Sequence, residues 1–135
     1  MKSFAFLISI LFALPAWADG FGFRTPSGNI YCNGSLYGGA IVDCVIVTRE
    51  PGSAPAQAGN CPAGRELEVS LDENGGSSSR CGRPSGRKST YSDIANYGVT
   101  AKFGNITCVS ESTGFQCVNP SGHGFFLSRR KQNIW

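Results

Sequence analysis

The chain has 135 residues and carries 12 lysines and arginines against 9 aspartates and glutamates, a formal net charge of +3. A balance this close to neutrality gives no argument for a nucleic-acid partner, and we expect none. No stretch beyond the N-terminus approaches the roughly 20 apolar residues of a membrane helix, so we expect no membrane span.

The first eighteen residues have the pattern of a secretory signal peptide. Lys2 precedes an apolar run over 4–14, and Ala16-Trp17-Ala18 is the small-x-small pattern that signal peptidase reads. We predict a signal peptide over 1–18, cleavage after Ala18, and one β domain over 19–135. Removing Lys2 leaves 11 basic and 9 acidic residues, a net charge of +2. The mature protein is expected in the periplasm or outside the cell.

Short β-prone runs follow, separated by turn residues. The turn sequence over 25–28 leads into a predicted strand over 29–32. The run over 41–48 is apolar apart from Asp43 and predicts a central strand. The segment 50–64 is rich in proline, alanine and glycine, and it predicts a loop without regular structure.

The stretch 66–71 alternates polar and apolar residues and predicts a strand. This alternation turns Glu66 and Glu68 outward and three apolar side chains inward: Leu67, Val69 and Leu71. The segment 72–76 predicts a turn, and 77–79 continues it as a flexible loop.

The last third begins with a basic segment rich in glycine, proline and serine. It contains Arg80, Arg83, Arg87 and Lys88. A single helical turn is predicted over 93–97, with Ser92 as its cap and Gly98 as its end.

Strands are predicted over 99–103 and 124–128, with a hairpin between them. About eight short strands without an ordinary helix indicate an all-β fold, a small disulfide-stapled antiparallel barrel or sandwich.

Six cysteines in a small exported chain indicate three disulfides, for which fifteen pairings exist. Two segments, Gly28 to Cys44 and Phe103 to Leu127, share the sequence Gly-Asn-Ile-x-Cys and predict two related hairpins. An antiparallel register that pairs Cys32 with Cys44 leaves 37–39 as a turn, and one that pairs Cys108 with Cys117 leaves 111–114. Cys61 and Cys81 then remain for each other. A non-reducing peptide map tests these pairs.

Several motifs resemble a family of small exported bacterial domains of unknown function. They are Thr25-Pro26-Ser27-Gly28-Asn29-Ile30-x-Cys32, Tyr97-Gly98, Cys108-x-Ser110, Gly114-x-x-Cys117-x-Asn119, and Gly122-His123-Gly124-Phe125-Phe126-Leu127-Ser128-Arg129. The likeness covers about 23–129 and departs most over 52–92, where many members carry a tryptophan near the third cysteine and this chain has Pro62-Ala63-Gly64-Arg65 after Cys61. The resemblance implies a secreted disulfide domain and brings no activity and no catalytic residues.

The only histidine, His123, lies between two glycines and is a candidate ligand-binding residue. As a catalytic base it would need a positioned nucleophile and an orienting carboxylate. The spacing nominates neither, and we favour a structural role in a turn. We predict no metal site and no cofactor, because a zinc site needs three or four ligands and the cysteines are expected to be oxidised.

The basic residues Arg83, Arg87 and Lys88 are candidate ligands for an anionic partner, although a solvated basic loop has the same composition. Glu66 and Glu68 lie about 7 Å apart by strand geometry, which is the spacing of an inverting glycosidase pair. Alternating glutamates are equally typical of any strand that faces solvent, and we favour that interpretation.

These observations predict an exported, non-enzymatic module that binds an envelope protein or an anionic cell-wall component through loops at one end of the fold. The loops nominated are 35–39 and 119–124, both rich in glycine. One alternative is a small envelope enzyme centred on His123, which a His123→Ala variant would test. Another is a structural surface protein, for which self-association would be the sign. The sequence leaves the oligomeric state open.

Overall fold

The computed structural model describes residues 19–36, 38–86, 88 and 91–135. Within these residues the chain forms eleven strands and one short 3-10 turn. The elements are β1 (Asp19–Arg24), β2 (Ile30–Ser35), β3 (Ile41–Ile46), η1 (Ala56–Ala58), β4 (Arg65–Asp72), β5 (Ser77–Pro84), β6 (Asp93–Ile94), β7 (Thr100–Phe103), β8 (Ile106–Glu111), β9 (Gly114–Val118), β10 (Gly124–Leu127) and β11 (Gln132–Ile134).

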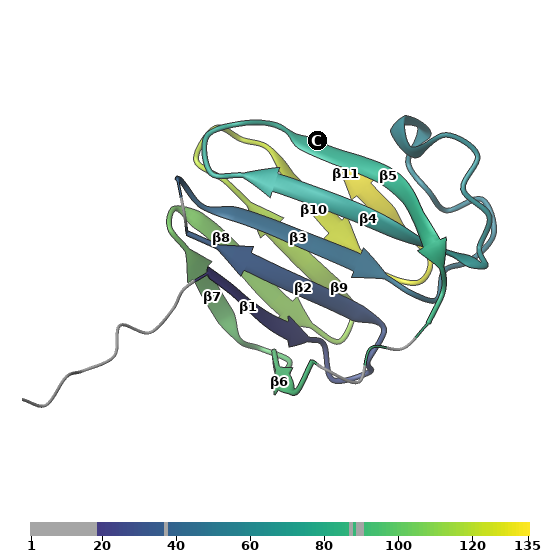
Figure 1. Ribbon diagram of the computed structural model, residues 1–135, viewed down its shortest axis with the longest axis horizontal. Coiled ribbons are helices and arrows are strands. Elements are labelled where there is room, and N and C mark those ends of the chain that lie inside the picture. The colour runs from purple at the N-terminus through teal and green to yellow at the C-terminus, as the bar shows by residue number, and fades with distance from the viewer. Residues whose placement is uncertain (1–18, 37, 87, 89–90) are drawn as a thin grey trace, which may run out of the picture.

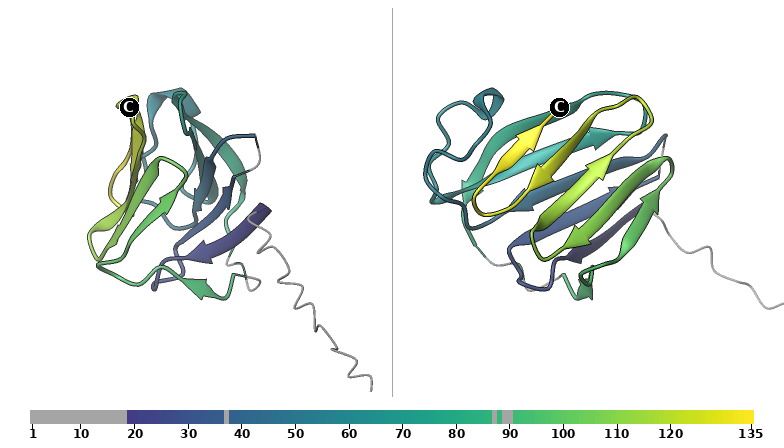
Figure 2. Two further views of the ribbon diagram at one scale, coloured as in Figure 1. Left: turned by 90° about the vertical axis from the view of Figure 1, so that its left-hand side faces the viewer. Right: turned by 180° about the vertical axis from the view of Figure 1, so that it is seen from behind.

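The strands form two sheets that face each other as a sandwich (Figures 1 and 2). The six-stranded sheet has the order β5-β4-β3-β2-β1-β6, and the five-stranded sheet has the order β11-β10-β9-β8-β7. All pairs are antiparallel except β1 with β6. The predicted all-β class is therefore confirmed, with a sandwich rather than a closed barrel. No helix in the described part of the chain is long and apolar enough to cross a membrane.

Alternation along the strands places one apolar face of each sheet inside the sandwich. Strand β4 buries Leu67, Val69 and Leu71 in this core, as its sequence predicts. Aromatic rings connect the two sheets, because Phe23 of β1 stacks on Phe103 of β7 and contacts Phe115 of β9, each with ring centroids 5.7 Å apart.

Three disulfides join Cys32 to Cys44, Cys61 to Cys81 and Cys108 to Cys117. These are the pairs expected from the spacing. The first crosses β2 and β3, the third crosses β8 and β9, and their Cα–Cα distances are 4.0 and 4.1 Å. The two hairpins lie in opposite sheets, with β8 and β9 behind β2 and β3 in Figure 1, and all four hairpin cysteines belong to the same core.

The hairpin turn after β8 is tighter than its sequence predicts. Glu111 pairs with Gly114, so the turn consists of Ser112 and Thr113 instead of 111–114. The register is the predicted one, and the strand pairing extends one residue pair further toward the turn.

Two segments form strands where the sequence predicts a loop or a helix. Residues 77–79 belong to β5, because the edge of β4 offers hydrogen-bonding groups and the Cys61–Cys81 disulfide holds β5 beside it. Asp93 and Ile94 form β6, and the N–H of Ala95 donates to the carbonyl of Arg24. Pairing with the free edge of β1 is more favourable than an isolated helical turn, whose nucleation is costly.

Candidate functional site

The predicted ligand-binding residues do not lie together. Arg83 is on β5, and Lys88 follows that strand. Arg87 lies outside the described residues. His123 lies near the other end of β5, because its ring nitrogen and the hydroxyl of Ser77 both contact the carbonyl of Trp135. Ser77 and Arg83 are six positions apart, about 20 Å along a strand.

Arg83 and Lys88 line a cleft of about 350 Å³ on the outer face of the six-stranded sheet, which we call the outer cleft. Its charged members are the acidic residues Asp43, Glu66 and Glu68 and the basic residues Arg80, Arg83 and Lys88. Its other side chains include Tyr31, Asn33, Ser70 and Tyr91. Three charges of each sign make its formal net charge zero.

Most charges in the outer cleft are held by a neighbour. Lys88 Nζ lies 3.2 Å from Glu66 Oε1, and Arg80 Nε is paired with Glu68 Oε2. The hydroxyl of Ser70 donates to Asp43 Oδ1. These contacts pair acidic and basic groups of the cleft with each other.

Glu66 does not face open solvent as its sequence pattern predicts. The residue is only 3% exposed, although it lies on the outer face of β4. Lys88 covers it and supplies the opposite charge, which a buried carboxylate requires. The strand alternation predicts the face correctly, but it carries no information about a later segment that folds over that face.

Tyr91 covers the other side of the outer cleft. Its hydroxyl accepts a hydrogen bond of 2.7 Å from Asn33 Nδ2, and its ring packs edge to face against Tyr31 at 5.3 Å. A Cβ atom at Gly22 would come within 2.8 Å of the Tyr91 ring. The glycine at position 22 therefore makes room for the tyrosine, and Tyr31 is buried as a result.

Arg83 differs from the other cations of the cleft. Its side chain is exposed and forms no ion pair or hydrogen bond with any part of the chain that the structure describes. Its guanidinium group, with five N–H donors in a planar fork, is therefore available to an anionic group.

His123 takes part in a turn. Its N–H donates to Asn119 Oδ1 at 3.0 Å, and its carbonyl accepts from the Asn119 N–H at 2.9 Å. Ring Nδ1 lies 3.2 Å from the Trp135 carbonyl, which can only accept, so Nδ1 carries a proton in this contact. These bonds support the structural role that the sequence favours.

The two glycine-rich loops nominated as a binding surface, 35–39 and 119–124, lie at the end of the sandwich that contains His123. Of the first loop, residues 35–36 and 38–39 are described. Hydrogen bonds within the chain connect the segments at this end. Glu73 accepts from the N–H of Ala40 at 3.0 Å and from the N–H of Asn105 at 2.9 Å. These backbone bonds, that of Ala40 first, lower the pKa of Glu73. Asn119 Nδ2 donates to the carbonyls of Asp72 and Gly75, both at 2.7 Å.

Besides a hollow of about 480 Å³ in the loop 51–63, two further hollows lie elsewhere on the sandwich. One of about 350 Å³ at the opposite end is polar and is lined by the turn 25–29, the hairpin turn 111–114 and the turn 127–129. The other, of about 200 Å³, is apolar and is lined by residues of both sheets, among them Ile94 of β6, Ala101 of β7 and Phe115 of β9. Neither contains His123 or the basic segment.

Glu66 and Glu68 are each engaged by a cation, so neither stands free to approach a scissile bond. The described residues contain no cluster of three histidine, cysteine or acidic side chains that could hold a metal ion. Local sequence patterns do not identify Tyr91 and Asn33 as residues of the cleft, because their contact joins positions 58 residues apart.

Comparison with known families gives one match. A model described as a family of unknown function, DUF6636, matches residues 6–135, which is nearly the whole chain. The chain belongs to this family. The predicted kinship with small disulfide-containing domains of unknown function is thus confirmed. No curated protein and no solved structure matches the chain.

Proposed function

We propose that the protein is an exported, non-enzymatic module that binds an anionic component of the cell envelope in the outer cleft. One observation carries this proposal: Arg83 is an exposed cation without a partner among the described residues, in a cleft whose other cations, Arg80 and Lys88, are already paired. A ligand carboxylate or phosphate can bind this guanidinium in a bidentate manner.

The remaining groups of the cleft suit a polar ligand of low net charge. Paired carboxylates and cations keep lone pairs and N–H groups for hydrogen bonds with hydroxyl and amide groups, and Tyr91 adds a ring beside them. Cell-wall polymers combine such groups with scattered anionic charges. The three disulfides support export, because they form in oxidising compartments and rarely in the cytosol.

Co-sedimentation with isolated peptidoglycan sacculi tests the proposal. Arg83→Ala is expected to weaken binding about tenfold or more, since a hydrogen bond to a charged group contributes about 1.5 to 3 kcal/mol. Lys102→Ala is the matched control, because Lys102 is another exposed cation without an ion pair in the described chain, and it lies on β7 outside the cleft.

Equal losses for both variants would reduce the interaction to general charge attraction and contradict a site in the outer cleft. Unchanged binding of Arg83→Ala would also contradict a site in the outer cleft. In the expected case only Arg83→Ala is released from the sacculi, and added salt weakens the wild-type interaction further.

A further inference from the structure

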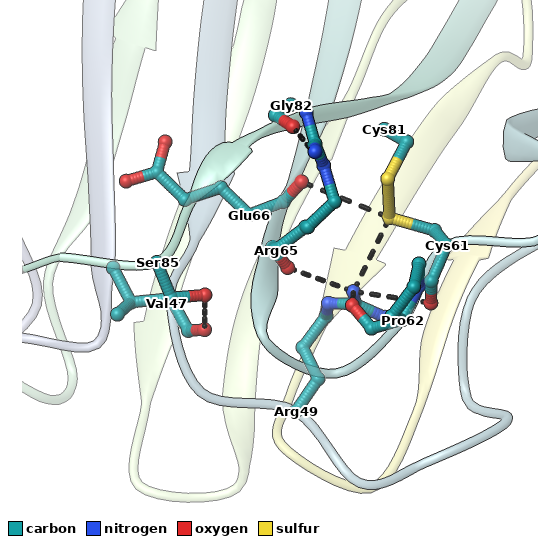
Figure 3. The surroundings of a disulfide bond; sticks show 9 residues. All are labelled: Val47, Arg49, Cys61, Pro62, Arg65, Glu66, Cys81, Gly82 and Ser85. Carbon is teal, nitrogen blue, oxygen red and sulfur yellow. Dashed lines mark hydrogen bonds between the residues drawn. A yellow bond between two sulfur atoms is a disulfide. The ribbon is translucent and has the colours of Figure 1, made fainter.

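Arg49 is a buried cation beside the Cys61–Cys81 disulfide (Figure 3). The residue is 4% exposed, and its Nη2 donates to the carbonyls of Pro62 and Arg65, both at 2.8 Å. The same nitrogen lies 3.3 Å from Cys61 Sγ, close enough for an N–H···S hydrogen bond. The guanidinium therefore contacts one sulfur of the disulfide directly.

The charge of Arg49 is not balanced by any acid in the described chain. Arg49 forms no ion pair there, and its Nε and Nη1 are buried without a hydrogen-bond acceptor. Burial lowers the pKa of Arg49, yet an arginine stays protonated in proteins. A buried cation with two unsatisfied nitrogen donors is costly, and an anion formed next to it is correspondingly stabilised.

We propose that Cys61–Cys81 is a thiol–disulfide exchange site, with Cys61 as the leaving sulfur and Arg49 as the counter-ion of its thiolate. A neighbouring cation lowers the pKa of a thiol, and a thiol of lower pKa leaves faster in disulfide exchange. The reactant is a dithiol whose attacking sulfur reaches Cys81. This inference is independent of ligand binding in the outer cleft.

The exchange balances as a two-electron transfer. A thiolate of the dithiol attacks Cys81 Sγ, and the S–S bond breaks with its electron pair moving to Cys61 Sγ beside Arg49. The second thiol of the reactant loses its proton and attacks the mixed disulfide, which releases the Cys81 thiolate to take up a proton. The reactant ends as a disulfide, and Cys61 and Cys81 end as thiolate and thiol.

Position in the fold permits this attack on Cys81. It lies on β5, an edge strand of the six-stranded sheet, and it is half-buried, whereas Cys61 is 6% exposed. After reduction, the bonds from Arg49 to the Pro62 and Arg65 carbonyls still hold the loop, so the opening stays local.

The two hairpin disulfides lack these features. Their four sulfurs belong to residues that are at most 1% exposed, and no hydrogen bond from a charged group reaches them in the described structure. They are expected to resist thiols that open Cys61–Cys81.

Titration of the oxidised protein in glutathione redox buffers, followed by alkylation and peptide mass mapping, tests the proposal. We expect Cys61 and Cys81 to become alkylated first, with Cys32–Cys44 and Cys108–Cys117 intact. Simultaneous opening of all three disulfides, or earlier opening of a hairpin disulfide, would overturn the proposal.

A second measurement isolates the role of Arg49. In Cys81→Ser, the ultraviolet absorbance of the Cys61 thiolate is followed against pH, and Cys61→Ser serves as the matched control for Cys81. An ordinary cysteine is a few per cent thiolate at pH 7; Cys61 is expected to exceed this about tenfold, and Arg49→Gln should abolish the excess. A Cys61 thiol that ionises like Cys81 would refute the role of Arg49. Should these variants not fold, the redox titration of the wild-type protein decides alone.

Discussion

Glu73 is the residue that ties three segments together at one end of the sandwich. It accepts N–H groups from Ala40 before β3 and from Asn105 before β8, and its own N–H donates to the Ala40 carbonyl at 2.8 Å. Gly104 makes this possible, since a Cβ there would come within 2.7 Å of Glu73 Oε1 and its φ is +58°. The contact joins the two sheets through one carboxylate.

This arrangement predicts a pH-dependent stability. The folded pKa of Glu73 lies below its ordinary value of 4.5, because the backbone N–H groups of Ala40 and Asn105 favour the ionised form. Its stabilising contribution is therefore complete above pH 4.5 and is lost as the pH falls through the lower folded value. We expect Glu73→Gln to lower the melting temperature at pH 7 and to approach wild type in more acidic solution.

Thermal melts across this pH range check the expectation. Glu111→Gln is the control, because Glu111 is an exposed carboxylate that forms no ion pair in the described chain. A Glu73→Gln deficit of the same size at pH 7 and at acidic pH would show that the carboxylate charge does not stabilise these loops.

At the scale of elements, a disulfide in the neighbouring hairpin determines the hydrogen-bonding phase of β7, that is, which of its N–H groups point toward β8. The Cα–Cα distance of 4.1 Å between Cys108 and Cys117 is that of a non-hydrogen-bonded pair, so Cys108 turns its backbone groups toward Ala101 of β7. The bond from the Ser110 N–H to the Val99 carbonyl agrees with this phase. Thr100 and Lys102 consequently direct their N–H groups away from β8, at an edge of the sheet.

Amide hydrogen exchange measured by NMR checks this phase. The N–H of Ala101 is expected to exchange at least about tenfold more slowly than those of Thr100 and Lys102, because of these three residues Ala101 alone directs its N–H toward β8. Protection of Lys102 with rapid exchange of Ala101 would contradict the phase.

At the scale of the whole molecule, local sequence patterns predict the hairpins and the core faces of the strands, but not the segments that pair with sheet edges or cover a sheet face. Turn chemistry and alternation predict the hairpins, the inward residues of β4 and the all-β class, because these properties depend on neighbours in sequence. By contrast, β5 and β6 form because they pair with the edges of β4 and β1. Glu66 is buried because Lys88, from a later segment of the chain, lies over it. The candidate site shares this origin, since Arg83 and Lys88 are recognisable by composition while Asn33 and Tyr91 meet only in the folded chain.

The most direct test of a binding site in the outer cleft is an NMR titration of the isotope-labelled protein with soluble muropeptides released from sacculi. We expect saturable shifts centred on Arg83, Glu68 and Tyr91, and their loss in Arg83→Ala. Shifts centred on the loop of His123, or none at concentrations where sacculi retain the protein, would contradict this expectation.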